Sequence, residues 1–265
     1  VWMRRCSRRL ASRAVFGNRP VVHKHMCNFK TFLNNDKIIL TSLIAKSSFK
    51  LVFAQELLYI NFTQNWAPHP LYISFIRDPV DRKIASFHGD RHLYKQYFNH
   101  SKVVGIPDNW LNMTFHECVV NNNVECRYNG LQVVSNKAGS GKNGFWPQRV
   151  EGMIPFFCGS SNLCRTLGRK EALASAVRNV EKRYAMVGLY EEIEKSLKLL
   201  EKLLPLHFTD IGRIYSQRRS LSRTHNFEVS AADRREMSLR YDMEYQFYSF
   251  LKERLHKQFA EHGIK

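Results

Sequence analysis

The stretch LYISFIRDPVDRKIASFH, Leu71 to His88, guides the interpretation of the rest of the chain. It begins with an apolar run, Leu71–Ile76, whose length and β-rich composition predict a buried strand. Arg77 follows this run, and Asp78 and Pro79 then have the residue types of an N-cap and a first helical position. The sequence therefore predicts a strand, a charged turn and a helix.

The position of Arg77 in this pattern predicts an anion-binding corner. Open α/β sheets bind their ligands at the carboxyl ends of the strands. A helix N-terminus beside that edge offers unpaired N–H groups and a partial positive charge, which suit a phosphate or a sulfate. From these residues alone, an ordinary strand–helix corner with an exposed arginine is an equally good interpretation.

Length and charge narrow the class of protein. A chain of 265 residues can bury one substantial core without dividing into domains. It has 41 Lys+Arg against 23 Asp+Glu, a formal net charge of +18, which favours a polyanionic partner such as nucleic acid, an acidic glycan or an anionic membrane. The sequence has no RNA- or DNA-binding signature, so we expect no nucleic-acid partner.

Membrane and secretion signals are not found in the sequence. No apolar run reaches the length of a transmembrane helix, and VWMRRCSRR at the N-terminus lacks the apolar core of a signal peptide. We therefore expect any membrane anchor to lie outside this chain.

The cysteines predict an oxidising compartment. Four of the six form two closely spaced pairs, Cys118/Cys126 and Cys158/Cys164. The spacings are not C-x-x-C and no histidine arrangement completes a zinc site, so we predict two local disulfides and no metal. Three glycosylation sequons also favour a lumenal protein, and they begin at Asn61, Asn99 and Asn112.

The C-terminal half alternates helices and a strand. Helical spacing predicts a helix over Arg169–Arg183 and an amphipathic helix over Tyr190–Leu204. Between them, a short apolar run predicts a buried strand over Tyr184–Leu189. Strands that alternate with helices predict an α/β fold of three layers. A long last helix begins at Ser230 and stops at Gly263, and its core stripe is Tyr241, Tyr245, Tyr248, Leu251, Leu255 and Phe259.

Three other segments are expected to lack long regular elements. GDRHLYKQYFNHSK (89–102) predicts a surface loop or a broken helix, and GRIYSQRRSLSRTHN (212–226) predicts a basic loop. The basic residues 1–20 predict at most a short helix before Gly17.

Several motifs carry a resemblance to a known family. IRDPVDRKIAS resembles the 3′-phosphate-binding stretch of Golgi sulfotransferases, I-R-D-P-x-x-R-x-x-S. FHECVVNNNVEC and IPFFCGSSNLC resemble segments of the uronyl and heparan sulfate 2-O-sulfotransferases, including the Pipe proteins, and the C-terminal RYDMEYQFYSFLKERLHKQFAEHGIK is most similar to the uronyl member. The resemblance covers roughly residues 58–265 and a short piece near His25.

The resemblance implies a fold and a function. The fold would be the three-layer, P-loop-like sulfotransferase fold, with a central parallel sheet flanked by helices. The function would be that of a Golgi glycosaminoglycan sulfotransferase, of the EC 2.8.2 class. It would move a sulfuryl group from 3′-phosphoadenosine 5′-phosphosulfate (PAPS) to the 2-O position of uronic acid in dermatan/chondroitin or heparan sulfate. A type II membrane anchor outside this chain and a homo-oligomer, by resemblance a trimer, are also implied.

The same resemblance assigns nucleotide contacts. Arg77 and Ser86 match the positions that hold the 3′-phosphate, through a guanidinium fork and a hydroxyl. Ser222, Arg223 and Thr224 fall in the loop that closes over the nucleotide in the family. A plain basic surface loop is the alternative interpretation of these three residues.

The family's catalytic base lies in a His-x-His pair, followed by a hydrophobic residue and an aromatic-x-Asn/Asp-Phe segment. Tyr59–Phe62 matches that segment, but the residues directly before it contain no histidine. VHKHM at residues 22–26 carries the pattern intact, and joining Met26 to Leu58 gives the continuous match HKHMLYINFTQNW. We therefore interpret residues 27–57 as an insertion relative to the family.

On this interpretation His25 is the general base and His23 its neighbour in the substrate site. The ordinary pKa of histidine suits a general base near neutral pH. If residues 27–57 were instead part of the core, with His25 far from Arg77, Glu56 would become the candidate base.

One family element has no match. The 5′-phosphosulfate is bound in the family by a P-K-T-x-S-T type turn well upstream of the histidine pair, but only 22 residues precede His23 and none of them match. We therefore divide the chain into a basic N-terminal remnant, 1–20, and a sulfotransferase domain, 21–265, that lacks this loop and is interrupted at 27–57. Because this turn has no match, an alternative interpretation is a non-catalytic paralogue or fragment that binds anionic glycans.

A second basic segment points toward the glycan. Arg91, His92 and Lys95 follow the 3′-phosphate stretch, and we expect them to help bind the acidic glycosaminoglycan. A solvated charged face is the commoner explanation for such residues.

Overall fold

The computed structural model describes the chain in segments. These are residues 13–16, 19–22, 42, 58–65, 68–98, 109–123, 125–128, 152–166, 168–219 and 227–264.

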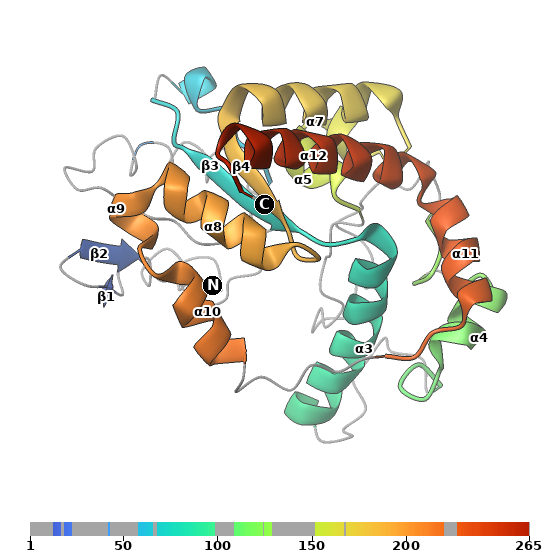
Figure 1. Ribbon diagram of the computed structural model, residues 1–265. Coiled ribbons are helices and arrows are strands. Elements are labelled where there is room, and N and C mark those ends of the chain that lie inside the picture. The colour runs from blue at the N-terminus through green and yellow to red at the C-terminus, as the bar shows by residue number, and fades with distance from the viewer. Residues whose placement is uncertain are drawn as a thin grey trace.

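A small parallel sheet lies at the centre of the described chain (Figure 1). Strand β3 (Tyr72–Ile76) pairs with strand β4 (Tyr184–Leu189), in register from Tyr72 opposite Tyr184 to Ile76 opposite Leu189, with one irregularity after Tyr72. Because the strands are parallel, their carboxyl ends lie at the same edge of the sheet.

Most of the remaining described chain is helical. The helices of six or more residues are α3 (Pro79–Phe98), α4 (Phe115–Val120), α7 (Lys170–Arg183), α8 (Ile193–Leu203), α10 (Ile211–Arg219), α11 (Ala231–Arg240) and α12 (Asp242–Glu261). The shorter ones are η1 (Phe62–Asn65), α5 (Ile154–Cys158), α6 (Asn162–Arg165) and α9 (Pro205–Phe208).

The structure is therefore a mixed fold of helices with a two-stranded parallel sheet. Helices α7, α8 and α12 all contact β4, and in Figure 1 α7 and α12 lie above the sheet and α8 below it. This arrangement is compatible with the expected α/β sulfotransferase fold, but a larger sheet in three layers is not part of the described residues. Strand β3 is less buried than its sequence predicts, since Phe75 is 38% exposed.

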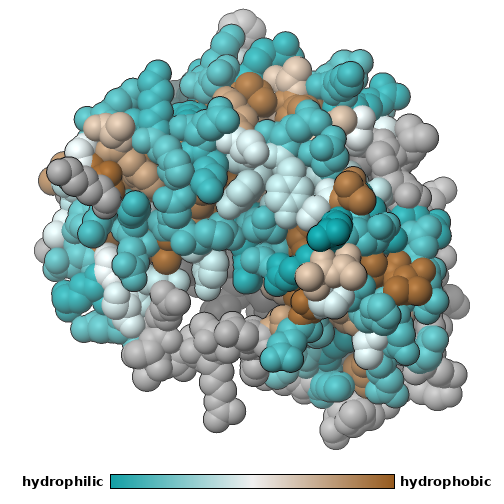
Figure 2. Space-filling model, turned by 45° about the vertical axis from the view of Figure 1, so that its right-hand side comes forward, coloured by the Kyte–Doolittle hydropathy of each residue, from teal (hydrophilic) through white to brown (hydrophobic). Residues whose placement is uncertain are grey.

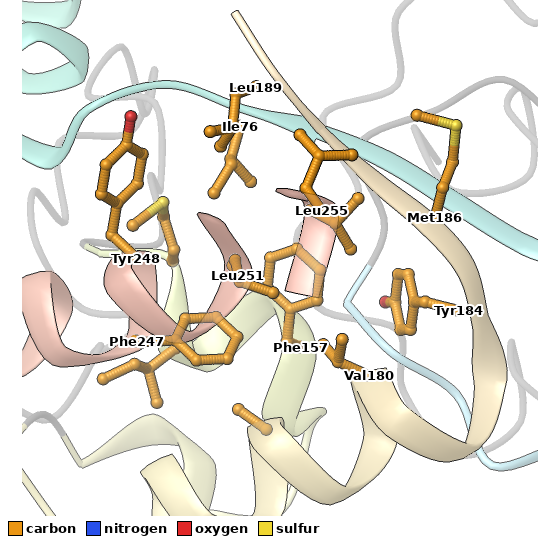
Figure 3. Packing of buried hydrophobic residues seen from close by; sticks show 14 of the residues in the cluster. Ile76, Phe157, Val180, Tyr184, Met186, Leu189, Phe247, Tyr248, Leu251 and Leu255 are labelled. Atoms are coloured by element: carbon orange, nitrogen blue, oxygen red, sulfur yellow. The ribbon is translucent and has the colours of Figure 1, made fainter. Parts of the chain in front are cut away.

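The main hydrophobic core joins the sheet to the helices around it (Figure 3). Tyr184 of β4 packs against Phe157 of α5, with ring centroids 5.0 Å apart, and Phe157 packs in turn against Phe247 of α12 at 5.2 Å. Leu251 and Leu255 extend the same face of α12. The long last helix is thus packed on the sheet, as its apolar stripe predicts.

The disulfide predictions are confirmed at the level of pairing. Cys118 and Cys126 are bonded, with Cα atoms 5.7 Å apart, and Cys158 and Cys164 are bonded, with Cα atoms 5.4 Å apart. The first bond lies in a second hydrophobic cluster, which α3, α4 and α11 share. This disulfide closes a short loop that packs in the same cluster as α3.

Three expected irregular segments are regular in the structure. Helix α3 continues through Gly89 to Phe98, because Ile84, Phe87 and Tyr94 share a buried face and their packing outweighs the helix cost of glycine. Part of the expected basic loop forms α10, which contacts α8. Near the N-terminus, an antiparallel pair, β1 (Arg13–Phe16) and β2 (Arg19–Val22), takes the place of a short helix.

The expected last helix is two helices. Ser230 caps α11, as predicted, by accepting the Asp233 N–H at 3.0 Å, but the helical run is interrupted at Tyr241. The break lets α11 contact α3 and α4 while α12 contacts β4 and α7. Glycine at 263 follows the end of α12 with a positive φ of 61°, as a C-terminal stop requires.

A buried carboxylate connects α12 to α5. Glu244 has no exposed surface, and its oxygens accept hydrogen bonds from the N–H groups of Met153 and Ile154 and from the Tyr128 hydroxyl at 3.0 Å. Burial raises the pKa of this carboxyl group. Gly152 makes room for it, because a Cβ at residue 152 would lie 2.2 Å from Glu244 Oε1.

Candidate anion-binding site

The corner between β3 and α3 has the local structure that its sequence predicts. Asp78 is the N-cap of α3: its Oδ1 accepts the N–H of Val80 at 2.9 Å and that of Asp81 at 3.0 Å. Pro79 is the first helical residue. Arg77 is thereby placed between the last residue of the strand and the cap of the helix.

The N–H groups of the first turn are already used, which corrects one expectation. Pro79 has no N–H, the next two N–H groups bond the Asp78 side chain, and the Arg82 N–H donates to the Asp78 carbonyl at 2.8 Å. An anion at this corner would therefore depend on Arg77 and on the partial charge of the helix rather than on unpaired backbone donors.

Arg77 has the features of an anion ligand. Its Nε atom is buried and has no hydrogen-bond partner among the described residues. Its guanidinium carbon lies 5.3 Å from the centre of the Tyr190 ring, a cation–π distance. Burying a guanidinium donor without a partner is unfavourable, so an anion that accepts from this side chain would satisfy it.

The loop after β4 forms the second wall of the corner. The Tyr190 N–H donates to the Ile76 carbonyl at 2.8 Å, and the Asp78 N–H donates to Glu191 Oε1 at 2.8 Å. The residues before and after Arg77 are therefore both hydrogen-bonded to the loop that follows β4. The Tyr190 side chain is 47% exposed beside it.

Helix α12 closes the corner from a third side. The Tyr245 hydroxyl lies 3.0 Å from both carboxylate oxygens of Asp78, and the Tyr248 hydroxyl donates to Glu191 Oε2 at 3.0 Å. Neither role was predicted from the sequence, because both tyrosines fall in the apolar stripe of the last helix. The signal available was the YEE sequence directly after β4, which places carboxylates at the same sheet edge as Arg77.

A stacked pair connects α3 to the segment before α11. The ring of His88 stacks on that of Phe227 with centroids 3.9 Å apart and an angle of 7° between the planes. Burial, with a contribution from the Arg91 charge, lowers the pKa of His88 and favours its neutral form. Phe227 begins the described segment before α11, so the stack joins that segment to the helix that carries Ser86.

The other predicted nucleotide and catalytic residues are only partly described. Ser86 is half-buried on α3, on the same helix whose start is capped beside Arg77. Ser222, Arg223 and Thr224 lie outside the described residues, as do His23 and His25. So do Glu56 and the expected insertion at 27–57, apart from Ser42. The proximity of the histidine pair to Arg77 stays a prediction.

The expected glycan-binding group is divided by the structure. Arg91 is only 6% exposed; its guanidinium donates two hydrogen bonds to Glu125, at 3.0 and 3.1 Å, and lies over the rings of Phe87 and Trp110. We therefore exclude Arg91 from the proposed glycan surface, because its charge is paired inside the protein. His92 and Lys95 are exposed.

The remaining predicted surface features are partly visible. Asn112 is exposed and Asn61 is half-buried, whereas Asn99 is outside the described residues. Within the described segments, no group of three or more His, Cys, Asp or Glu side chains is arranged to hold a metal ion. The described helices include none with both the length and the apolar character needed to cross a bilayer.

The chain is similar in sequence to known sulfotransferases. No protein-family model matches the chain. The chain is 32% identical over 226 residues to the uronyl 2-sulfotransferase homolog pip of Drosophila melanogaster, an alignment that covers 80% of this chain and 42% of that protein. It is 27% identical over 241 residues to the uronyl 2-sulfotransferase of Homo sapiens, covering 87% of this chain and 54% of that protein.

A second group of relatives is similar over a shorter part. The chain is 28% identical over 193 residues to heparan sulfate 2-O-sulfotransferase 1 of Xenopus laevis, covering 69% of this chain and 47% of that protein. The chain thus spans about half the length of the curated relatives that it matches.

Proposed function

The chain is a homologue of the uronyl 2-sulfotransferases and the heparan sulfate 2-O-sulfotransferases, and from this premise we propose that it is a glycosaminoglycan sulfotransferase. It transfers the sulfuryl group of PAPS to the 2-hydroxyl of uronic acid residues in dermatan/chondroitin or heparan sulfate. The proposal includes the family's three-layer fold, a Golgi lumenal location with a type II anchor outside this chain, and a homo-oligomeric, trimeric assembly.

The observation that carries the proposal is the corner at Arg77. A half-buried arginine whose Nε is buried without a partner, directly before a capped helix at the carboxyl edge of a parallel sheet, fits a doubly charged phosphate. In the proposed complex Arg77 and Ser86 bind the 3′-phosphate of the donor. Ser222, Arg223 and Thr224 contribute from the part of the chain between α10 and α11.

The proposed transfer requires a general base for the proton of the acceptor hydroxyl and a positively charged group that stabilises the leaving phosphate. In the proposed reaction the bond between the sulfur and the bridging oxygen of the phosphosulfate breaks, and a new bond forms between the sulfur and the uronic acid 2-oxygen. The displaced hydroxyl proton goes to His25, which acts as the general base, and His23 contacts the sugar. The leaving group is adenosine 3′,5′-bisphosphate.

The acidic glycan is matched by the charge of the chain. The formal net charge of +18 favours a polyanion, and His92 and Lys95 are exposed on the turns of α3 beyond the Arg77 corner. The face of the molecule in Figure 2 is mainly hydrophilic, with hydrophobic residues in small separate groups. Such a face suits a hydrated sugar chain better than a membrane.

The alternative function is glycan binding without turnover. The specific observation in its favour is the excess of positive charge, which binds a polyanion whether or not sulfate is transferred.

A transfer assay separates the two functions. The chain, and a form extended by upstream coding sequence, would be incubated with PAPS labelled in its sulfuryl group and with desulfated dermatan, chondroitin or heparan chains. Label that appears on the 2-hydroxyl of uronic acid after disaccharide analysis would support the enzyme. Retention of the chain on heparin without label transfer by either form would favour the binding protein.

A further inference from the structure

Two carboxylates lie at the corner that holds Arg77, and each is bonded by groups of the protein other than arginine. Asp78 is next to Arg77 in the chain, and Glu191 follows Tyr190, whose ring lies 5.3 Å from the guanidinium carbon. In the described part of the chain, neither carboxylate forms an ion pair with Arg77.

Helix α12 explains why the carboxylates do not take up the arginine. The Asp78 carboxylate accepts two backbone N–H groups of α3 and the Tyr245 hydroxyl, which lies 3.0 Å from both oxygens. The Glu191 carboxylate accepts the Asp78 N–H on one oxygen and the Tyr248 hydroxyl on the other, at 2.8 and 3.0 Å. The acceptor oxygens are therefore oriented toward α3 and α12.

The tyrosines are well suited to remain donors. Burial, together with the charge of Asp78, raises the pKa of Tyr245 to about 12. Burial and the neighbouring Glu191 charge also raise the pKa of Tyr248. Both hydroxyls therefore keep their protons throughout the physiological range and donate continuously to the carboxylates.

We propose that Tyr245 and Tyr248 are positioning residues of the Arg77 site: their hydroxyls hold Asp78 and Glu191 away from the guanidinium and so keep Arg77 available to an anion. The inference rests on the proposed function, since it takes the anion to be the 3′-phosphate of the donor. Without the hydroxyls, the two carboxylates gain free lone pairs at the corner, and pairing with Arg77 competes with the phosphate.

The test removes tyrosine hydroxyls at the Arg77 corner and at one other place in the protein, and compares the effects on nucleotide binding. Tyr245→Phe, Tyr248→Phe and the double variant remove the hydroxyls at the corner. Tyr128→Phe is the matched control, because Tyr128 also donates its hydroxyl to a carboxylate, Glu244 Oε1 at 3.0 Å, away from Arg77. Each protein would be titrated with adenosine 3′,5′-bisphosphate and with adenosine 5′-monophosphate, which lacks the 3′-phosphate. Thermal unfolding of each variant would be recorded in parallel.

The double variant is expected to bind the bisphosphate about three- to tenfold more weakly, the effect of losing one ordinary hydrogen bond. Its affinity for the monophosphate should stay unchanged. Tyr128→Phe should bind both nucleotides as the parent chain does, even if its unfolding temperature falls as far as that of the double variant. The single variants give the same comparison if the double variant fails to fold.

Three results would overturn the inference. Equal losses for the two nucleotides would show a general structural role for the tyrosines. Unchanged bisphosphate binding in the tyrosine variants, with a clear loss in Arg77→Ala, would reject the positioning role and leave the proposed function intact. Unchanged binding in Arg77→Ala as well, or no binding by the parent chain, would overturn the inference and the proposed function together.

Discussion

Arg77 and Arg91 show how the same side chain serves two purposes in one stretch of sequence. Arg91 is paired with Glu125 and packed against two aromatic rings, so its charge is compensated inside the protein and loss of either partner would leave a buried charge unpaired. The Nε atoms of both arginines are buried without a partner, but Arg77 forms no ion pair with a described residue. Both residues have the same charge in the sequence, and only their neighbours show that the charge of Arg91 is paired inside the protein, whereas Arg77 stays the proposed anion ligand.

Gly152 and Gly89 give a prediction about stability at the residue scale. Gly152→Ala should lower the free energy of unfolding by more than about 2 kcal/mol, because the residue has a φ of 78° and a Cβ would collide with the buried Glu244. Chemical denaturation measures this change.

Gly89→Ala is the matched control. Gly89 lies within α3, where a Cβ would meet nothing within 4 Å. Alanine should therefore raise the free energy of unfolding by roughly 0.5–1 kcal/mol, the difference in helix propensity. Equal effects of the two substitutions would contradict the packing described around Glu244.

At the scale of elements, the Cys118–Cys126 bond should stabilise the cluster of α3, α4 and α11. Replacing both cysteines by alanine should lower the free energy of unfolding by about 2.5 kcal/mol, the loop-entropy value for the sequence separation of 8. Denaturation without reductant measures the loss, and reductant should reduce the difference from the parent chain. Peptide mapping under non-reducing conditions that finds these thiols free would contradict the bond.

The elements that sequence predicted well are those with one dominant signal. The strand Tyr184–Leu189 and helix α7 have the predicted bounds within one residue, because apolar period and charged ends agree there. The bonds of both cysteine pairs followed from their spacing. The N-cap at Asp78 followed from residue type alone.

The elements that sequence missed depend on tertiary contacts. Gly89 disfavours a continued helix in GDRHLYKQYF, and the buried faces of Phe87 and Tyr94 explain why α3 continues through it. The tyrosine bonds at the Arg77 corner join residues more than 50 positions apart, such as Tyr248 and Glu191, which one sequence cannot pair. The motif predicts Arg77 and Ser86 as site residues, whereas the hydrogen bonds around Arg77 are seen only in the structure.

At the scale of the whole molecule, the catalytic assignment depends on residues 27–57. If this segment is an insertion, removing it should bring His25 within hydrogen-bond reach of the acceptor hydroxyl. The segment is apolar enough to favour aggregation when exposed, with Ile38, Ile39, Leu40, Leu43, Ile44, Leu51, Val52 and Phe53. Deleting 27–57 should therefore raise the yield of soluble protein.

The deletion protein, extended upstream of Val1, should transfer sulfate in the labelled-donor assay, and His25→Ala in the same background should abolish the transfer. His262→Ala, at the end of α12, is a control for loss of a histidine as such. A deletion protein that no longer folds would show that 27–57 belongs to the core. Glu56 would then replace His25 as the candidate base.

Arg77 is proposed to bind the 3′-phosphate of a nucleotide donor, and calorimetric titration with adenosine 3′,5′-bisphosphate measures that binding. Arg77→Ala should weaken binding by roughly 1.5–3 kcal/mol, the range for hydrogen bonds to charged groups. Arg213→Ala, which removes an exposed arginine paired with Asp210, should leave the affinity unchanged. A dissociation constant for Arg77→Ala equal to that of the parent chain would contradict the claim and leave Arg77 an ordinary corner residue.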